Sequence, residues 1–554
     1  MSRKKIDTSK LLLGQMMDHP LLISDILVHA KKHHGDTEIV SRRTEGDIHR
    51  YTYADCELRA RKVAQALERL GIIPGERVGT LAWNGYRHFE LYYGISGSGS
   101  VCHTINPRLF QEQISYIINH ADDKVIFFDI SFLPLVEKIK SACPNVGKWI
   151  CLIDEYQMPR SDSLELVCYE TLINAEEGNY EWPTFDENAA SVLCYTSGTT
   201  GNSKGALYSH RSTVLHAYAS AMPDSISISN LDTIMPVVPM FHVNAWGIPY
   251  SSPLVGAKIV FPGAKLDGAS VYELLEKEGV TMSAGVPTIW AALLKHVTDN
   301  KLSFTTFNRT LIGGSSCPPA MMDAFHNLGV RVIHAWGMTE LSPLGTIAGL
   351  KAKDLKKSKA EQNLILQKQG RSIYGIDMKI VDSDRNPLPH DGKTAGDLLV
   401  KGAWVINNYF QESNSPLFDG WFPTGDVATI DRDSNMQITD RSKDVIKSGG
   451  EWISSIDIEN IAISHPDILM AACISTPHPK WDERPLLVVV KKPECDKDEA
   501  ALKKEIIEYF DGKIAKWWIP DEVVLIAEMP FTATGKLYKL KLRELLKDHL
   551  HPFS

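Results

Sequence analysis

The stretch that most constrains this chain is rich in small polar residues and reads YTSGTTGNSKG at positions 195–205. It follows the apolar run 191–194 and leads toward residues 210–216, which have the composition of a helix. Glycines allow backbone N–H groups to turn toward an anion, serine and threonine add short donors, and a lysine adds a mobile positive charge. The stretch therefore predicts a phosphate-binding loop.

Three alternatives compete with this prediction. The P-loop of NTPases requires glycine directly before the lysine, but Ser203 precedes Lys204. Residues 201–205 also match the G-x-S-x-G elbow of serine hydrolases, with Ser203 as nucleophile, although no HGGG-type oxyanion segment precedes them. The third alternative is a polar surface loop without a ligand, which the density of Ser, Thr and Gly disfavours.

Composition narrows the class of protein. The 554 residues suffice for roughly three to four domain-sized units. A net charge of -9 and a pI near 6.1 disfavour nucleic-acid binding. The nine cysteines are odd in number and show no C-x-x-C pair, so we expect buried or free thiols in a reducing compartment. No run of about eighteen apolar residues and no secretory h-region occurs, which predicts a cytoplasmic protein without a membrane span.

Alternating helical and strand-like segments between residues 50 and 140 predict a parallel α/β arrangement. Strand-like residues 310–312 and 332–333 each run into a glycine-containing exit, which indicates ligand contacts at the carboxyl ends of parallel strands. Residues 241–247 hold His242 and Trp246 among apolar neighbours and suit the wall of an apolar pocket. A histidine satisfied within the core is the alternative for His242.

The residue pattern changes in the C-terminal part of the chain. Short strands and turns predict a β-rich subdomain at about 375–440. A charge-dense segment at 440–451 precedes what we expect to be a separate domain of about 110 residues. We therefore predict a large domain at 1–440 and a small α+β domain at 441–554.

Five motifs occur in order over about 340 residues, at 195–205, 336–340, 424–426, 440–444 and 534–536. Together they resemble the adenylate-forming superfamily of acyl-CoA synthetases, luciferases and peptide-synthetase adenylation domains. Residues 334–340 and 440–454 are similar to medium- and long-chain fatty acyl-CoA synthetases. The length of the chain and residues 21–40 also resemble those of bacterial methylmercaptopropionate-CoA ligases. Many relatives carry tyrosine where this chain has Trp336; stacking on a base survives that exchange, but a role for a phenol hydroxyl does not.

The resemblance implies a large α/β domain, a small mobile C-terminal domain, and an acid–thiol ligase that uses ATP, Mg²⁺ and coenzyme A. A carboxylate is a poor electrophile, so the first half-reaction attaches AMP to it and releases pyrophosphate, mainly through charge stabilisation and alignment. Coenzyme A then attacks the acyl-adenylate. We expect an aliphatic acid, a fatty acid of short to long chain, with the sulfur-containing 3-methylmercaptopropionate as the alternative.

The family's roles carry over by position. Glu340 would bind Mg²⁺, Trp336 would lie along the adenine, and Asp426 would accept from both ribose hydroxyls. The resemblance implies ATP or AMP contacts for Thr196, Ser197, Gly198, Thr199, Thr200, Gly201, Lys204, Gly314, Ser315, Ala335, Trp336, Gly337, Met338, Thr339, Asp426, Arg441 and Lys536. The acyl pocket would include His242, Trp246, Gly313 and Gly314.

Lys536 would compensate the charge that develops between the carboxylate and the α-phosphate, with His242 and Lys204 as the other catalytic residues. Lys443 takes the hinge position, about which the family rotates its small domain between the half-reactions. The implied coenzyme A contacts are Lys447, Gly449, Gly450 and Glu451.

Other functions remain open from sequence. In one alternative the adenylate passes to a separate carrier protein instead of coenzyme A. In another, the chain is a non-catalytic AMP- or ATP-binding sensor. Dimers are common among relatives, so the resemblance also suggests a homodimer.

Overall fold

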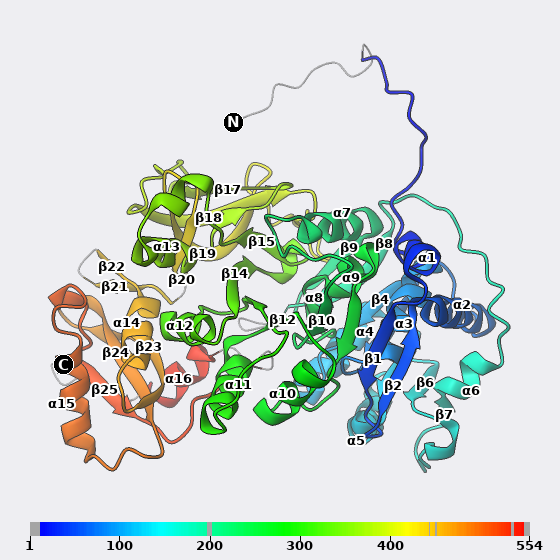
Figure 1. Ribbon diagram of the computed structural model, residues 1–554, viewed down its shortest axis with the longest axis horizontal. Helices are drawn as coiled ribbons and strands as arrows, with labels where there is room; N and C mark the ends of the chain where they lie inside the picture. The colour runs from blue at the N-terminus through cyan, green and yellow to red at the C-terminus, as the bar shows by residue number, and fades with distance from the viewer. Residues whose placement is uncertain (1–10, 197–201, 442–443, 449–450, 533–536, 548–554) are drawn as a thin grey trace.

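The computed structural model describes residues 11–196, 202–441, 444–448, 451–532 and 537–547, and only the backbone at 451–452. The strands of these residues form four sheets. Figure 1 shows two large sheets with their helices in the blue-to-green part of the chain, and the C-terminal sheet at the opposite end of the molecule. The parallel α/β arrangement expected from the sequence is confirmed.

One of the two large sheets has seven strands, and its interior pairs are parallel because helices connect successive strands. Strand β5 is buried at every position, as expected for a sheet covered on both faces. In spatial order the strands are β7 (Leu166–Cys168), β6 (Lys148–Leu152), β5 (Val125–Asp129), β3 (Arg77–Leu81), β4 (Val101–Thr104), β8 (Ala190–Tyr195) and β9 (Gly205–Ser209). The helices of this part are α1 (Ile23–His34), α2 (Tyr53–Arg69), α3 (Tyr86–Gly97), α4 (Gln111–Ala121), α5 (Leu133–Ile139) and α6 (Tyr169–Asn174).

The second large sheet has nine strands, with a parallel centre and antiparallel edges. In spatial order they are β16 (Arg371–Ser372), β15 (Leu344–Ile347), β14 (Arg331–Gly337), β13 (Arg309–Ile312), β12 (Met282–Gly285), β10 (Thr233–Pro236), β11 (Lys258–Phe261), β1 (Glu38–Arg42) and β2 (Ile48–Thr52). Its helices are α7 (His210–Ala221), α8 (Val243–Trp246), α9 (Ile248–Val255), α10 (Gly268–Lys277), α11 (Pro287–Asp299) and α12 (Pro319–Asn327).

The third sheet is antiparallel and occupies the segment predicted to be β-rich. Its strands are β17 (Ile376–Val381), β18 (Ala395–Gly402), β19 (Phe422–Ile430) and β20 (Met436–Arg441). The charge-rich segment before it forms α13 (Lys359–Leu366), which carries one buried residue, Gln362. This agrees with a mostly solvated helix.

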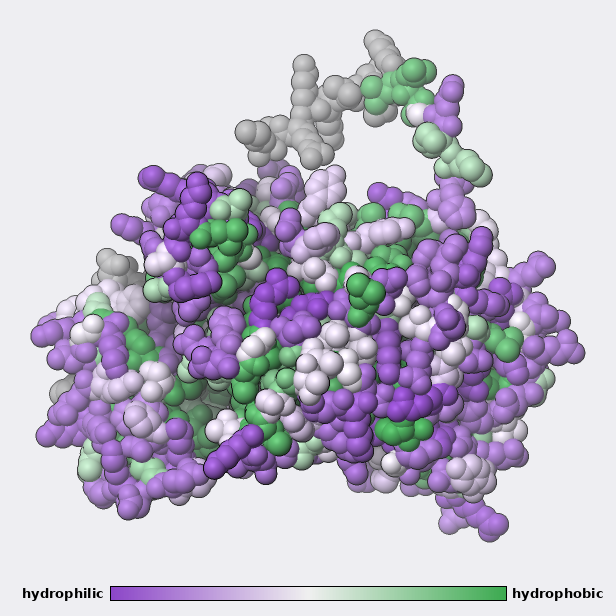
Figure 2. Space-filling view, in the orientation of Figure 1, coloured by the Kyte–Doolittle hydropathy of each residue, from purple (hydrophilic) through white to green (hydrophobic). Residues whose placement is uncertain are grey.

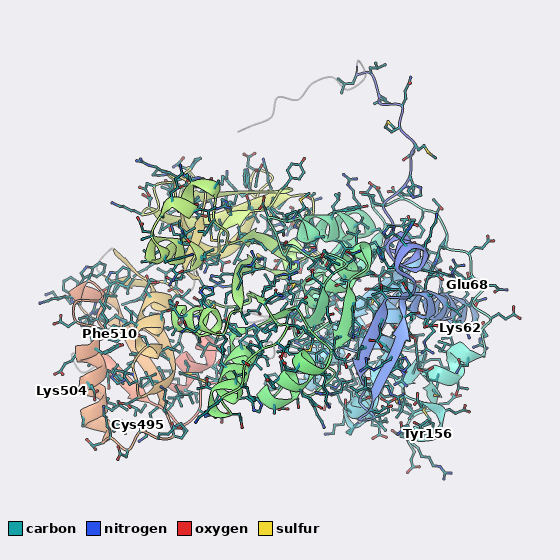
Figure 3. The ribbon with its side chains drawn as sticks, in the orientation of Figure 1. Lys62, Glu68, Tyr156, Cys495, Lys504 and Phe510 are labelled. Atoms are coloured by element: carbon teal, nitrogen blue, oxygen red, sulfur yellow. The ribbon has the colours of Figure 1, made fainter. Side chains whose placement is uncertain are left out.

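The C-terminal residues form a sheet with its own apolar core. The strands are β22 (Glu451–Ile453), β21 (Ile446–Ser448), β24 (Asp482–Lys491), β23 (Ile468–His478) and β25 (Glu522–Leu525), and the helices are α14 (Ser455–Ile463), α15 (Glu499–Tyr509) and α16 (Lys539–Leu545). Phe510 and Cys495, labelled in Figure 3, are buried in this core. A separate core supports the predicted small domain, while the boundary at residue 440 stays a prediction.

Two surface features complete the description. The N-terminal residues from 11 run away from the body, and Leu12 and Met17 are almost fully exposed. Figure 2 shows apolar residues on this extended segment, whereas the visible face of the body is largely hydrophilic.

Among the described residues, no helix has the length and apolar character needed to cross a bilayer. All nine cysteines are free and buried, as predicted.

Candidate active site

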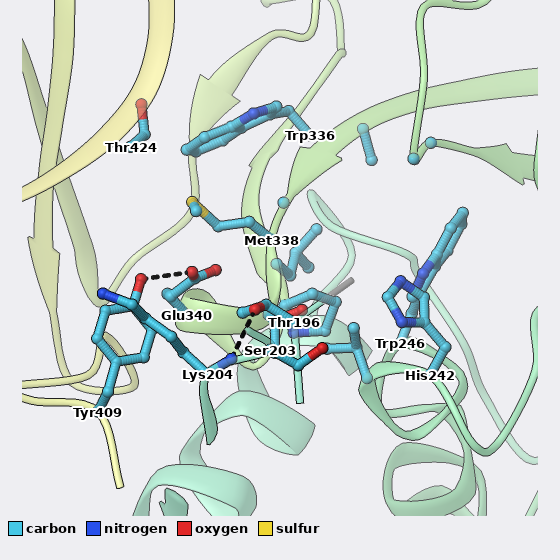
Figure 4. A pocket seen from close by; sticks show the side chains of 18 of the residues that line it. Thr196, Ser203, Lys204, His242, Trp246, Trp336, Met338, Glu340, Tyr409 and Thr424 are labelled. Carbon is cyan, nitrogen blue, oxygen red and sulfur yellow. Dashed lines mark hydrogen bonds between the residues drawn. The ribbon is translucent and has the colours of Figure 1, made fainter. Parts of the chain in front are cut away.

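A cavity of about 550 Å³ is lined by residues at the carboxyl ends of strands from both large sheets. Thr196 follows β8, Gly313 follows β13, and Gly337 ends β14, while Arg441 reaches the cavity from the end of β20. The sequence-predicted residues that line it are Thr196, Lys204, His242, Trp246, Gly313, Gly314, Ala335, Trp336, Gly337, Met338, Thr339, Glu340 and Arg441. Figure 4 shows His242 and Trp246 on one side of the cavity and Lys204 and Glu340 on the other.

The polar loop is the connection of a β-hairpin. Strand β8 pairs with β9 in antiparallel register, with Tyr195 opposite Gly205. Thr196 N donates to Lys204 O at 2.9 Å, and Lys204 N donates to Thr196 Oγ1 at 3.1 Å, so two hydrogen bonds join the two ends of the loop. Strand β9 therefore separates the loop from α7, and no helix begins directly at the loop as in a P-loop. Ser197, Gly198, Thr199, Thr200 and Gly201 lie outside the described residues.

The part of the cavity near Lys204 contains an aromatic residue, Tyr409, that no sequence motif predicted. The Lys204 Nζ lies 4.9 Å from the centre of the Tyr409 ring, a cation–π distance. Tyr409 donates its hydroxyl to Glu340 Oε1 at 2.7 Å. Burial and the Glu340 charge raise the pKa of Tyr409, so the phenol stays a donor. No signal in the sequence around Tyr409 links it to Lys204, because 205 positions separate them.

The part of the cavity near Trp336 depends on a cross-strand pair. Asp426 and Arg441 lie opposite each other on β19 and β20, and Arg441 Nε is 2.8 Å from Asp426 Oδ1. Trp336 Nε1 donates to Asp426 Oδ2 at 2.9 Å. The positive φ of Gly425 lets the chain turn so that Asp426 N donates to the Thr424 hydroxyl at 3.1 Å. Arg441 lines the cavity, and Asp426 lies behind it at 1% exposure.

The part of the cavity formed by His242 and Trp246 has an unusual backbone. Four consecutive residues, Val243 to Trp246, have positive φ between 47° and 58°, so α8 is a left-handed turn. Each such residue costs about 1–2 kcal/mol relative to a right-handed conformation. The Asn244 side chain anchors the turn, since it accepts from Cys194 Sγ at 3.0 Å and donates to the Tyr250 hydroxyl at 3.4 Å. Burial raises the pKa of Cys194 to about 11, which keeps the thiol protonated and able to donate.

Trp246 and Gly313 lie close together in the cavity wall. A Cβ on Gly313 would lie 3.3 Å from Trp246 Cη2, closer than ordinary contact. The turn thus presents His242 at its start and the Trp246 indole at its end to one cavity.

Some predicted residues do not line the cavity. Ser315 and Lys447 are exposed, and the Lys447 backbone N–H donates to Glu483 Oε2. Lys443, Gly449, Gly450 and Lys536 lie outside the described residues, as does the Glu451 side chain. Their assigned roles stay predictions.

Other lining residues came from no sequence motif. His120 contacts the Tyr195 hydroxyl through Nδ1 at 2.7 Å, and burial lowers the pKa of its imidazole. The further residues of this kind are Tyr116, Phe410 and Glu412. Their segments belong to α4 and to an irregular loop, where residue type alone carries no sign of a ligand.

The serine hydrolase alternative finds no support in this geometry. Ser203 is 3% exposed, and its hydroxyl has no hydrogen-bond partner among the described residues. A catalytic serine needs a base within hydrogen-bond reach.

The chain matches two protein families and is similar to full-length relatives. The family described as AMP-binding enzyme matches residues 27–410, and the AMP-binding enzyme C-terminal domain matches residues 457–536. The chain is 53% identical to a 3-methylmercaptopropionyl-CoA ligase of Ruegeria lacuscaerulensis, covering 97% of the chain and 100% of the relative. It is 50% identical to a medium-chain-fatty-acid–CoA ligase of Ectopseudomonas oleovorans, covering 97% and 98%.

A solved structure agrees with these matches. The crystal structure of the anthranilate CoA ligase AuaEII in complex with anthranoyl-AMP has a TM-score of 0.85 at 24% identity, covering 96% of the chain and 98% of that protein. This likeness shows a shared fold. Because the two family matches span both the large sheets and the C-terminal sheet, and half of all residues are shared with full-length relatives, the chain belongs to the AMP-binding enzyme family.

Proposed function

We propose that the chain is an ATP-dependent acid–CoA ligase, an AMP-forming acid–thiol ligase that makes an acyl-adenylate and then an acyl-CoA thioester. Family membership and the two relatives support this reaction class. One observation carries the proposal: a polar end with Lys204 and Glu340 and an apolar end with His242 and Trp246 open into the same cavity. Such a cavity suits a nucleotide joined to an apolar acid.

In the first half-reaction an oxygen of the acid attacks the α-phosphate and pyrophosphate leaves. The reaction needs alignment and compensation of negative charge. Lys204 supplies positive charge at the phosphate end, and the Tyr409 ring under its ammonium favours that position. His242, at the start of the left-handed turn, would orient the acid carboxylate at the other end.

The Glu340 position fits Mg²⁺. The carboxylate lines the cavity, is 7% exposed, and one of its oxygens accepts from Tyr409, so it is oriented in advance. One protein carboxylate together with substrate phosphates is a common ligand set for this ion. When bound, the ion neutralises charge on the phosphate oxygens.

Lys536 would act at the reacting centre, and coenzyme A would then attack the adenylate after a rotation about Lys443. Gly449 and Gly450 would permit close approach of the pantetheine, with Lys447 and Glu451 nearby in sequence. The role of Lys536 rests on its motif position and on the match of residues 457–536 to the family's C-terminal domain. The roles of the residues at 443–451 rest on the motif positions alone, since these residues lie between the two matched ranges.

The acid is proposed to be aliphatic. Residues Val243, Trp246 and Leu311 supply apolar lining, and the Trp246 indole fills the space beside Gly313. The 53% identity to a 3-methylmercaptopropionyl-CoA ligase favours a short sulfur-containing acid as a second candidate beside a medium-chain fatty acid.

Pyrophosphate exchange into ATP tests the proposal. The panel would contain 3-methylmercaptopropionate, butyrate, octanoate and palmitate, each with and without coenzyme A. We expect exchange with at least one acid, followed by thioester formation when coenzyme A is added. Nucleotide binding without exchange for any acid would favour the sensor, and transfer only to a carrier protein would favour the carrier alternative.

The cellular location and the oligomeric state are two further proposals. A reducing, cytoplasmic location agrees with nine free, buried cysteines. The homodimer stays a prediction that sedimentation equilibrium can test.

A further inference from the structure

The indole of Trp336 does more than present a flat face to the cavity. Its Nε1 donates to Asp426 Oδ2 at 2.9 Å, and the two residues are 7% and 1% exposed. An indole N–H is a donor only, so the direction of this hydrogen bond is fixed. It joins β14 of the nine-stranded sheet to β19 of the four-stranded sheet, and its acceptor is a carboxylate in a buried setting, where such bonds are strong.

The orientation of the indole is itself fixed by packing. A Cβ on Gly345 would lie 2.5 Å from Trp336 Cζ3, so the ring occupies the space that any side chain at this position would need. Leu341 packs against the same region, since its Cδ2 is 3.1 Å from that Cβ position. A phenol in place of the indole would carry its hydroxyl at the far end of the ring and not on its edge.

The other carboxylate oxygen of Asp426, Oδ1, has different hydrogen bonding. Oδ1 is buried and lies 2.8 Å from Arg441 Nε, yet it accepts no hydrogen bond from the described residues. The ion pair therefore lacks the alignment of a hydrogen bond. Arg441 lines the cavity and its side chain is 46% exposed, so it covers Oδ1 from the cavity side. Oδ1 keeps acceptor capacity for a hydroxyl donor that displaces Arg441.

We infer that Trp336 is a positioning residue for sugar recognition: its indole N–H holds the Asp426 carboxylate so that Oδ1 is presented to the ribose hydroxyls of the nucleotide. This inference rests on the proposed function, in which the cavity binds ATP. Because the carboxylate cannot rotate while Oδ2 is held, the enzyme discriminates between ribose and deoxyribose through Trp336 as well as through Asp426. Adenine stacking alone predicts no such dependence on the sugar.

The test compares ATP with 2′-deoxy-ATP and 3′-deoxy-ATP in Trp336→Phe, which keeps an aromatic face and removes the N–H. With a saturating acid, the ratio of kcat/KM for ATP to that for each deoxynucleotide should fall about tenfold, the loss expected for a hydrogen bond to a charged group. Asp426→Asn should lower the ratio likewise, and Trp336→Phe combined with Asp426→Asn should lower it no further. Trp404→Phe is the matched control, because it removes another buried indole hydrogen bond, to Leu344 O at 3.0 Å, and Trp404 itself does not line the cavity. It should leave the ratio unchanged.

If Trp336→Phe lowers kcat/KM equally for ATP and for both deoxynucleotides, the inference is overturned and stacking is the whole role of Trp336. If that variant does not fold, as judged by its thermal midpoint, Trp336→Tyr replaces it with the same expectation. Absence of pyrophosphate exchange in the unmodified enzyme would instead overturn the proposed function, so the two failures are distinguishable.

Discussion

The two sides of the cavity are built in different ways. On the nucleotide side, ordinary antiparallel register places Asp426 opposite Arg441, and charged and indole groups complete the site. On the side with His242 and Trp246, the backbone itself is strained through Val243 to Trp246, and the Asn244 side chain and a hydrogen bond from Ala245 N to Pro239 O at 3.2 Å hold it. We therefore expect a substitution in this turn to change acid selection and a substitution at the Asp426–Arg441 pair to change nucleotide binding, each independently of the other.

The largest expected effect concerns Lys536, whose predicted role is at the reacting centre, and it provides a reference for both sides. Lys536→Ala should slow adenylation by about 100- to 1,000-fold, the loss typical of a key charge stabiliser. Thioester formation from supplied acyl-AMP should survive. Rapid-quench measurement of both half-reactions checks this, and the loss should be equal for every acid in the panel. An equal loss in both half-reactions would contradict the assigned role.

Asp426→Ala tests the nucleotide side. It should raise KM for ATP about 30-fold, because a hydrogen bond to a charged group worth about 2 kcal/mol is lost. The order of preference among acids should not change, since Asp426 and the left-handed turn share no contact in the described residues. Steady-state kinetics over two acids decides the point. A reordered acid preference would show that the two sides are coupled.

Asn244→Ala tests the acyl side. It removes the contacts with Cys194 and Tyr250, so kcat/KM for the preferred acid should fall about fivefold, as for a hydrogen bond worth about 1 kcal/mol. KM for ATP should stay within twofold of the original, a change of about 0.4 kcal/mol or less. Asn244→Gly is the matched control: glycine accepts positive φ without strain but also lacks the side-chain contacts. If Asn244→Gly keeps the original acid preference, the backbone and not the amide determines it.

The smallest effect concerns stability at the point where the sides meet. His216 Nε2 accepts from Leu344 N at 3.2 Å, and its ring fills the space beside Gly247. Burial lowers the pKa of His216 to about 4, below its ordinary value of 6.5. The unfolded chain therefore binds the proton first as pH falls, and the stability present above pH 6.5 is lost between pH 6.5 and pH 4.

For His216 this loss amounts to about 2 kcal/mol between pH 7 and pH 5. Urea midpoints at these two values should differ less in His216→Gln than in the original protein. The same pH dependence in both proteins would contradict a neutral His216 in the fold.

Sequence reasoning predicted the elements whose signal is local. The apolar runs of β5 and β13 and the glycine exits after β13 and β14 can be recognised from a few neighbouring residues. The helix predicted at 210–216 is confirmed as part of α7, whereas β9 had no prediction, because a five-residue strand directly before a helix leaves no punctuation in the sequence.

The missed features of the site depend on tertiary structure. Tyr409 meets Glu340 only through the packing of distant segments. The left-handed turn contains no glycine before Gly247, so the usual signal for positive φ is absent from Val243 to Trp246. Trp336 was predicted from a motif, but its bond to Asp426 requires two sheets to approach each other.

Arg441 has one more consequence for the molecule. It is the last residue of β20, and the next described strand, β21, begins at Ile446 in the C-terminal sheet. A sugar that displaced this guanidinium from Asp426 would act on a residue only five positions before that sheet. We expect nucleotide binding to bear on the C-terminal sheet through this short connection.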